Sequence, residues 1–346
     1  MTLIYFILIL GAVVFVHELG HFLFARLAKV HVYEFAIGMG KKIFSYKKKG
    51  GVTEYSIRMI PLGGFCQIAG ENGDFEEEEI PSDRKMCNKS FIQRFMILFF
   101  GAGFNFIFAF ILLFIIGLCY GSISSDPIIG GVSEQYPAYE AGLSEGDKIL
   151  ALNGVKVSTW DDVLWELDLN KDKSVIFKVE KENGQVKEIA VTPQKVEQDD
   201  VTDYVYGISR STTKERGFVV SLKYAVTKTQ SLFKMMFNTV KSLFTGGVSV
   251  NDLSGPVGIY NIVGTQAKAG LESIIYLVAF LSINVGFINL IPLPAFDGGR
   301  ILFLIIEKII GKPINPKVEG MIHTIGFFLL IILMIYVTFN DILRLF

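Results

Sequence analysis

Four long apolar stretches stand out along the chain and predict membrane-spanning helices. They comprise residues 2–28, 95–120, 274–296 and 321–339. Each reaches the roughly 20 residues that an α-helix needs to cross a bilayer. The third stretch holds two asparagines and two prolines, and broken backbone at membrane depth is tolerated only where it lines a cavity or is buried in protein. The pattern therefore predicts a polytopic α-helical membrane protein with one irregular span.

The polar segments indicate how these spans are oriented. Residues 30–90 are rich in lysine and arginine. By the positive-inside rule we expect this loop to be cytoplasmic, which places both termini and the segment after the second span outside the cytoplasm. No basic residue precedes Arg26 and no small-x-small cleavage site is evident, so we expect the first stretch to be a retained span rather than a cleaved signal.

The cytoplasmic loop contains a strand pattern. Residues 52–60 alternate between apolar and polar side chains, residues 61–64 read Pro-Leu-Gly-Gly, and residues 65–70 continue the apolar pattern. This predicts a membrane-associated β-hairpin. Two interpretations remain open: an ordinary cytosolic hairpin, or one that leans into the membrane beside a site, where its edge can pair with an extended substrate.

The segment between the second and third spans is expected to be β-rich. Short apolar strands alternate with Asn-Gly turns, and a short helix fits residues 161–169. The run from Pro137 to Gly154 resembles the PDZ domains of bacterial proteases. PDZ domains bind peptides by strand addition, and Gly130, Gly131 and Val132 are the edge expected to do so. The alternative is a domain that acts as a steric filter and binds no specific tail.

These segments give the expected domain organisation. It comprises an N-terminal membrane part at residues 1–121, an inserted extracytoplasmic PDZ domain at 122–195, a linker with an amphipathic helix at 196–253, and a C-terminal membrane part at 254–346. The amphipathic helix carries lysines at 223, 228, 234 and 241 and is expected to lie along the outer membrane surface.

Composition agrees with this picture and excludes some functions. The chain has 346 residues, of which 51% are hydrophobic, and its mean hydropathy is +0.45. Its net charge of -1 gives no global field that favours nucleic acid. Cys66, Cys87 and Cys119 lack C-x-x-C spacing, which argues against both a disulfide framework and a zinc knuckle.

The first apolar stretch contains His17-Glu18-Leu19-Gly20-His21, an H-E-x-x-H motif. Residues four apart lie on one face of a helix, so His17 and His21 can offer two imidazoles to one metal ion, as zinc requires. Glu18 lies beside them, where it can take a proton from a metal-bound water. The alternative is a helix whose polar groups merely reach the interface, but unpaired ionisable groups are costly in lipid and are functional candidates by default.

A second polar group lies at the break in the third stretch. Residues 289–299 read Asn-Leu-Ile-Pro-Leu-Pro-Ala-Phe-Asp-Gly-Gly. Together with the first motif, this sequence resembles the intramembrane zinc metalloproteases of the site-2 protease family, in the bacterial RseP/RasP branch with a single PDZ domain. The resemblance extends over nearly the whole chain, including the Ser-Gly-Pro-Val-Gly loop at residues 254–258.

The resemblance implies an activity and a set of roles. His17, His21 and Asp297 would bind one zinc ion, and Glu18 would be the catalytic base. The residues implied to hold the substrate backbone are Asn284 and Asn289, together with Gly63, Gly64 and Phe65 of the predicted hairpin. The implied reaction is peptide-bond hydrolysis in or near transmembrane segments.

The resemblance also implies substrates and a location. The substrates would be single-span membrane proteins that have already been clipped, such as anti-sigma factors and signal-peptide remnants. The location would be the bacterial plasma membrane, in contact with the lipid bilayer, with a possible peptide C-terminus at the PDZ domain and no nucleic-acid partner.

One departure from the family pattern lies in the second span. Family members often carry Gly-Pro ahead of an Asn there, whereas Gly101 is followed by Ala102. This departure weakens the carry-over of the family pattern to Asn105, but not to the metal site. Small residues such as Gly101 and Gly103 permit close helix packing in lipid, and an asparagine can form hydrogen bonds between helices.

Three other functions compete with the protease. A non-catalytic membrane scaffold that presents a PDZ domain requires no metal and no role for Glu18. A metal-ion transporter predicts polar residues along several spans, whereas the last stretch offers only His323 and Thr324 near one end. A soluble zincin is excluded because the helix that carries the motif is apolar on all sides.

Overall fold

The computed structural model describes residues 1–71, 80–198, 201–246, 249 and 253–344. Within them, four helices are long and apolar enough to cross a membrane. They are α1 (Thr2–Leu27), α2 (Phe91–Tyr120), α7 (Leu271–Leu290) and α9 (Pro316–Leu343). The prediction of a multi-pass membrane protein is confirmed, with the third span ending at Leu290. The chain divides into two compact units, Met1–Leu112 with Ser249–Phe346, and Leu113–Val248.

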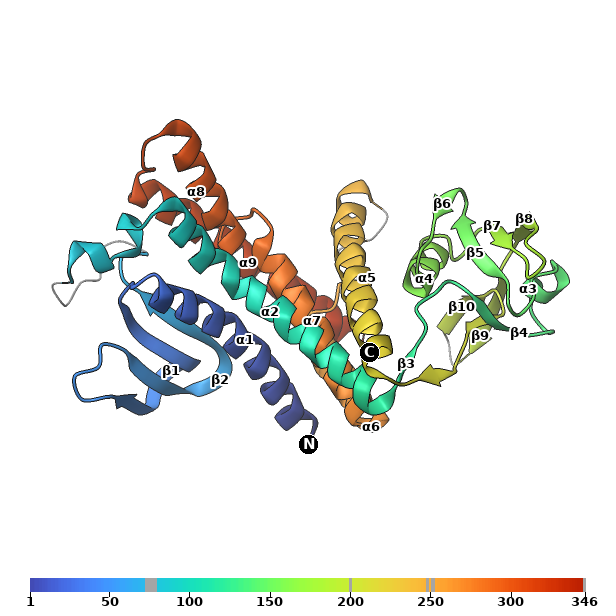
Figure 1. Ribbon diagram of the computed structural model, residues 1–346, viewed down its shortest axis with the longest axis horizontal. Helices are drawn as coiled ribbons and strands as arrows, with labels where there is room; N and C mark the ends of the chain where they lie inside the picture. The colour runs from blue at the N-terminus through green and yellow to red at the C-terminus, as the bar shows by residue number, and fades with distance from the viewer. Residues whose placement is uncertain (72–79, 199–200, 247–248, 250–252, 345–346) are drawn as a thin grey trace. The chain divides into compact units, whose positions relative to one another are not determined.

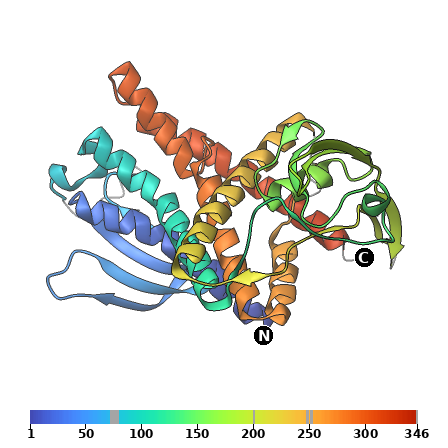
Figure 2. The same ribbon diagram turned by 45° about the vertical axis from the view of Figure 1, so that its right-hand side comes forward.

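Helix α1 is central to the first unit. It lies between α2 and a β-sheet (Figures 1 and 2). Its N-terminal half packs against α6 (Pro256–Ala269) and α7 through Phe6, Ile9, Val13, Val263, Leu277 and Leu281. Its C-terminal half packs against α2 and the sheet through Phe22, Ala25, Val32, Phe35, Ile68, Ile97 and Leu98. The turn that carries the two histidines lies between these apolar clusters, so burial on both sides fixes its position.

The β-sheet of the first unit differs from the predicted hairpin. It consists of β1 (Val32–Lys47) and β2 (Glu54–Ile68). Phe35 pairs with both Tyr55 and Cys66, so the two halves of β2 lie on opposite sides of β1. The prediction that residues 52–60 pair with residues 65–70 is therefore wrong, because β1 is inserted between them.

Two glycines allow β1 to bend. Gly38 and Gly40 have φ angles of 86° and 84°, a region that costs a non-glycine residue free energy. Beyond the bend, Phe44 pairs with Ile57 and Lys47 with Glu54, so the distal half of β1 returns along β2. The sheet is thus built from four short segments of two bent strands.

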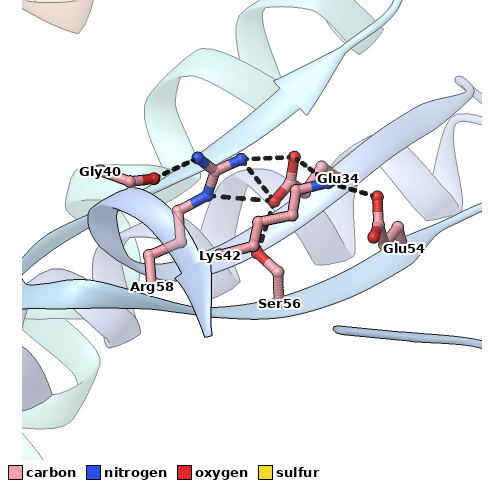
Figure 3. A network of polar contacts seen from close by, with 6 residues as sticks. All are labelled: Glu34, Gly40, Lys42, Glu54, Ser56 and Arg58. Atoms are coloured by element: carbon pink, nitrogen blue, oxygen red, sulfur yellow. Dashed lines mark hydrogen bonds and ion pairs between the residues drawn. The ribbon is translucent and has the colours of Figure 1, made fainter. Parts of the chain in front are cut away.

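A buried carboxylate holds the bent sheet together (Figure 3). Arg58 donates hydrogen bonds from Nη2 to both carboxylate oxygens of Glu34, each at 2.8 Å, and from Nη1 to the carbonyl of Gly40 at 2.7 Å. Ser56 also donates to Glu34, and Lys42 lies 3.4 Å from it. Burial raises the pKa of Glu34, but the hydrogen bonds from Ser56 and Arg58 outweigh burial and hold the pKa below its ordinary value.

Short elements complete the first unit. They are two 3-10 turns, Ser82–Arg84 and Met86–Asn88, and the amphipathic helix α8 (Asp297–Ile310). Helix α6 begins in the Gly/Pro-rich loop that the sequence indicated. There the backbone N–H of Gly258 donates to Asp341 Oδ2 at 2.8 Å, so a carboxylate from α9 caps the N-terminus of α6.

The second unit contains a β-rich core. A four-stranded sheet has the order β6-β5-β7-β8, and β4 pairs with β11, β9 with β10 and β3 with β12. The strands are β3 (Ser122–Ile123), β4 (Ile129–Val132), β5 (Lys148–Leu152), β6 (Val155–Lys156), β7 (Val175–Glu180), β8 (Val186–Val191), β9 (Gln194–Gln198), β10 (Val201–Val205), β11 (Ile208–Arg210) and β12 (Lys214–Glu215). The buried core includes Ile129, Leu152, Val163, Phe177 and Val179. Short strands separated by turns are present in this region, as the sequence predicts.

Three helices accompany this core: α3 (Pro137–Glu140), α4 (Trp160–Leu169) and α5 (Phe218–Thr245). Helix α4 begins with a capping box between Thr159 and Asp162. Helix α5 packs against the first turn of α4. There Lys228 Nζ lies 2.7 Å from Asp161 Oδ2, and Ser231 Oγ lies 2.6 Å from the same oxygen. The long amphipathic helix predicted after the β-rich segment is therefore joined to it by a partly buried ion pair.

Candidate metal centre

Three side chains from two distant segments meet in the first unit. His17 and His21 lie one turn apart on α1, and Asp297 is the first residue of α8. The Nε2 atoms of the two histidines are 3.2 Å apart, and each lies 3.2 Å from Asp297 Oδ2. Both histidines are buried, at 8% exposure. The structure thus brings together the three residues that the sequence proposed as metal ligands.

The geometry of these three atoms fits a tetrahedral metal ion. Ligand atoms about 2.0–2.1 Å from a tetrahedral zinc lie about 3.3 Å from one another, close to the 3.2 Å separations observed here. Asp297 Oδ2 is buried and, although both Nε2 atoms lie 3.2 Å away, it accepts no hydrogen bond from the described residues. A metal ion between the three atoms would satisfy this buried oxygen, which is costly to leave without a hydrogen bond. Two imidazoles and one carboxylate are also a donor set that zinc accepts, with a fourth position left for water.

Close helix packing delivers the two histidines to this position. A β-carbon on Gly20 would lie 1.9 Å from the carbonyl oxygen of Phe100, so only glycine lets α1 approach α2 at this turn. The other ring nitrogen of His21, Nδ1, lies 2.9 Å from the carbonyl oxygen of Ile97. Nδ1 of His17 lies 3.5 Å from Nδ2 of Asn105. Helix α2 therefore contacts both imidazoles at their Nδ1 atoms.

A tight loop delivers Asp297. Ala295 has a φ angle of 77°, and its N–H donates to Nδ1 of His323 at 3.0 Å. A β-carbon on Gly298 would lie 2.3 Å from the carbonyl oxygen of Ile291, so the first turn of α8 packs directly on the preceding loop. The prolines end α7, and the glycine then allows the chain to return, which explains why Asp-Gly follows Pro-x-Pro.

Glu18 lies next to His17 on α1 and faces the sheet. A β-carbon on Gly64 would lie 3.6 Å from Glu18 Cγ and 2.8 Å from the carbonyl oxygen of Ala36. Glu18 is not one of the three residues whose donor atoms converge. It therefore lies between the candidate ligands and β2.

The other residues predicted to bind substrate fall in two places in the first unit. Gly63, Gly64 and Phe65 are in β2, where the guanidinium of Arg58 stacks over the Phe65 ring at 4.7 Å. Asn284 and Asn289 are half-buried on α7, the helix that leads into the Asp297 loop. Both sets lie on elements that adjoin the metal centre.

The structure places Gly130, Gly131 and Val132 in one strand of the second unit. These residues form β4, which pairs with β11 through Val132–Ile208 and Gly131–Ser209. On its other side, Ile129 exchanges backbone hydrogen bonds with Gly146 and Asp147. On this second side the backbone hydrogen bonds involve Ile129 and not the three predicted residues. Peptide binding by Gly130, Gly131 and Val132 therefore stays a prediction.

Three residues at the centre were given no site role from sequence. Gly101 contacts His21, Asn105 contacts His17, and His323 holds the Asp297 loop. An asparagine within an uncharged span was a signal for Asn105, because such a side chain seeks a partner in lipid. Gly101 and His323 carried no comparable signal, since their importance depends on distances between helices that are far apart in sequence.

Comparison with known proteins identifies the family. The sequence profile of Peptidase family M50 matches residues 5–333. The regulator of sigma-W protease RasP of Bacillus subtilis is 34% identical over 421 aligned residues, which cover 100% of this chain and 99% of that protein. The zinc metalloprotease RasP of Bacillus licheniformis is also 34% identical, with the same coverage. With a profile match across almost its full length and relatives aligned end to end, this chain belongs to peptidase family M50.

Proposed function

We propose that the protein is a zinc-dependent intramembrane endopeptidase whose metal ligands are His17, His21 and Asp297. The observation that carries this proposal is the convergence of their three donor atoms, 3.2 Å from one another, with both histidines on α1, a helix that is long and apolar enough to cross a membrane. The relatives that are named zinc metalloproteases support zinc as the metal. Zinc held at this site supplies a Lewis acid and lowers the pKa of a bound water to about 7.

Glu18 is the proposed general base and acid. It is adjacent in sequence to a ligand but outside the convergent triad, so its carboxylate remains available for proton transfer. It takes a proton from the attacking water and then delivers it to the nitrogen of the leaving amine. Its position beside Gly64 places this proton transfer next to β2.

The proposed substrate contact is the edge of β2 at Gly63, Gly64 and Phe65. A transmembrane helix pairs all of its backbone groups internally and hides its carbonyls, so a substrate must unwind before cleavage. Strand addition to β2 supplies replacement backbone partners for the unwound segment. Asn284 and Asn289 are proposed to bind the substrate backbone from the side of α7.

The sheet of β1 and β2 carries an exposed apolar surface, as a sheet that leans into the membrane requires. Several large apolar side chains of β1 and β2 are exposed, including Ile43 at 69%, Phe44 at 59% and Met59 at 59%. Burial of apolar area in lipid stabilises such a surface. This favours the interpretation in which the sheet leans into the membrane beside the metal centre.

The orientation and the second unit extend the proposal. The lysine-rich segment that includes β1 is proposed to be cytoplasmic, which places residues 122–195 and both termini outside the cytoplasm. We assign residues 122–195 to a PDZ domain. Within it, β4 carries Gly130, Gly131 and Val132, the proposed edge for a peptide, and a steric role that excludes unclipped proteins is the alternative. Deletion of residues 122–195 tests the steric role. If the domain excludes unclipped proteins, the deletion variant should cleave them, and a variant that still leaves them uncleaved would argue against this role.

The proposed substrates are single-span membrane proteins already clipped by another protease. One relative is named a regulator of sigma-W protease, which supports anti-sigma factors as one class. Signal-peptide remnants are a second class with the same architecture, a single apolar helix with little extracytoplasmic mass. Both would reach the site from within the bilayer of the bacterial plasma membrane.

The test compares purified wild-type protein with Glu18→Gln on a tagged single-span substrate, with metal content measured in both. We expect wild type to cleave, Glu18→Gln to be inactive, and both to hold about one zinc ion. A folded wild-type protein that holds no zinc and cleaves nothing would refute the proposal and favour a non-catalytic scaffold. Metal that is carried across the membrane, with no cleavage, would favour a transporter.

A further inference from the structure

The side chain of Asn105 contacts the nitrogen of His17 that points away from the metal centre. Its Nδ2 lies 3.5 Å from His17 Nδ1. Asn105 is 0% exposed, and its Oδ1 has no hydrogen-bond partner among the described residues. An unpartnered buried amide oxygen costs on the order of 1–3 kcal/mol, so this arrangement needs a physical explanation.

The tautomer of a metal-bound histidine supplies that explanation. When Nε2 of His17 gives its lone pair to a metal, the remaining ring proton lies on Nδ1, which then acts as a donor. A donor there needs an acceptor, and Nδ2 of an amide is itself a donor. The two ends of an asparagine amide are exchanged by a half turn about its last bond. After that turn, Oδ1 of Asn105 accepts from His17 Nδ1, and the unpartnered oxygen gains a partner.

The second histidine shows the same arrangement. Nδ1 of His21 lies 2.9 Å from the carbonyl oxygen of Ile97, which can only accept a hydrogen bond. Ile97 and Asn105 lie on the same helix, α2. An oxygen acceptor behind each imidazole fixes the ring and raises its strength as a ligand.

Helix α7 holds Asn105 in place. The hydroxyl of Ser282, which is fully buried, donates to the backbone carbonyl of Asn105 at 3.0 Å. A β-carbon on Gly286 would lie 2.6 Å from Phe106 Cε1 and 3.1 Å from the carbonyl oxygen of Ala102. This close approach of α7 to α2 leaves the Asn105 turn little room to move, so the side chain can act as a rigid support.

We infer that Asn105 is a positioning residue of the metal centre, which accepts a hydrogen bond from Nδ1 of metal-bound His17 and holds that ring in the ligating tautomer. This inference rests on the proposed function, because it requires that His17 bind the metal through Nε2. Asparagine suits this position because it accepts from His17 when metal is bound and donates to His17 when metal is absent.

The test measures the zinc affinity of the full-length protein by chelator competition at one fixed pH. Asn105→Leu, which has similar volume and no acceptor, is expected to bind zinc 10–100-fold more weakly. Asn105→Asp keeps an acceptor at the Oδ1 position and is expected to restore the affinity to within a few fold of wild type. Ser221→Ala is the control, because it removes an equally buried hydroxyl that donates to the carbonyl oxygen of Gly217, outside the metal centre, and it is expected to leave zinc affinity unchanged.

The outcomes separate this inference from the proposed function. Wild-type zinc affinity in Asn105→Leu would overturn the inference, as would equal weakening in the Leu and Asp variants, which would indicate a packing role alone. If Asn105→Leu does not purify as a folded protein, Asn105→Ala tests the same loss of an acceptor without added bulk. Zinc binding by His17→Ala that equals that of wild type would instead refute the metal site itself.

Discussion

Gly101 on α2 lies directly against the imidazole of His21. A β-carbon at position 101 would be 2.2 Å from His21 Nε2 and 2.4 Å from Cε1, well inside van der Waals contact. The helix cannot easily withdraw, because α1 and α2 also touch at Gly20 and Phe100. The smallest side chain at position 101 must therefore displace a candidate metal ligand.

Gly101→Ala is consequently expected to abolish activity while the protein remains folded. Misplacement of a reacting group by about 1 Å can cost on the order of 100-fold in rate, and this variant displaces the ligand atom itself. Cleavage of a model substrate and zinc content are the measurements. Gly103→Ala is the matched control, because its β-carbon would meet only Phe99 and Phe100 side-chain atoms at 3.1 Å or more. Equal activity in both variants would contradict this account.

His323 provides a second, less direct support for the centre. Its Nδ1 accepts the N–H of Ala295 in the loop that carries Asp297. His323→Leu leaves that N–H without a partner, at a cost of about 1–3 kcal/mol, and should lower both thermal stability and cleavage rate. His323→Asn places an acceptor oxygen near the position of Nδ1 and should restore much of the loss. A Leu variant with the stability and rate of wild type would show that the loop does not depend on this hydrogen bond.

The spans and the β-rich segment could be predicted because their signals are local. An uninterrupted apolar run needs no partner to be recognised, and the short apolar strand β5 is followed directly by an Asn-Gly turn. The convergence of His17, His21 and Asp297 followed from motifs whose chemistry requires a common metal ion. In these places the local pattern and the three-dimensional structure agree.

Strand β1 shows why the rest could not be predicted. Its residues 38–42 contain two glycines and two lysines, a composition that disfavours a strand on propensity alone. What makes it a strand is pairing with two segments of β2 and ion pairs to Glu34, and those contacts depend on register. Gly101 and Asn105 present the same difficulty, because their role is set by the distance between α1 and α2 rather than by neighbours in sequence.

Glu34 should make the stability of the sheet depend on pH. Because the pKa of Glu34 is held below its ordinary value, its contribution is present above the unfolded pKa of about 4.3 and is lost as the pH falls through the folded value. Glu34→Gln removes an acceptor for Ser56 and Arg58 and should cost on the order of 1.5–3 kcal/mol at neutral pH. It should also reduce the loss of stability in acid.

Hydrogen exchange of β1 and β2 between pH 7 and pH 4 measures this effect in the full-length protein. Glu54→Gln is the control, since Glu54 pairs with Lys42 in a more exposed position, and such pairs contribute about 0–1 kcal/mol. Comparable exchange in the two variants would show that the buried network does not control the stability of the sheet.

The Asp161–Lys228 pair joins α4 to α5 and should be energetically coupled. Its side chains are 15% and 12% exposed, so either single replacement leaves a partly desolvated charge without its partner. Burial raises the pKa of Asp161, but Lys228 and Ser231 outweigh burial and keep the pKa below its ordinary value. A double-mutant cycle with Asp161→Asn and Lys228→Met is therefore expected to give a coupling energy of about 1–3 kcal/mol in thermal unfolding.

The exposed pair Lys178–Glu188, 3.8 Å apart, provides the matched cycle, and its coupling is expected to be near zero because water screens both charges. The comparison decides whether α5 is fixed to the β-rich segment or only adjacent to it. If the Asp161–Lys228 cycle gave no more coupling than the Lys178–Glu188 cycle, α5 would be free to leave α4 at little cost. A large coupling would instead mean that α4 and α5 move together, so that the helix that follows the β-rich segment stabilises it.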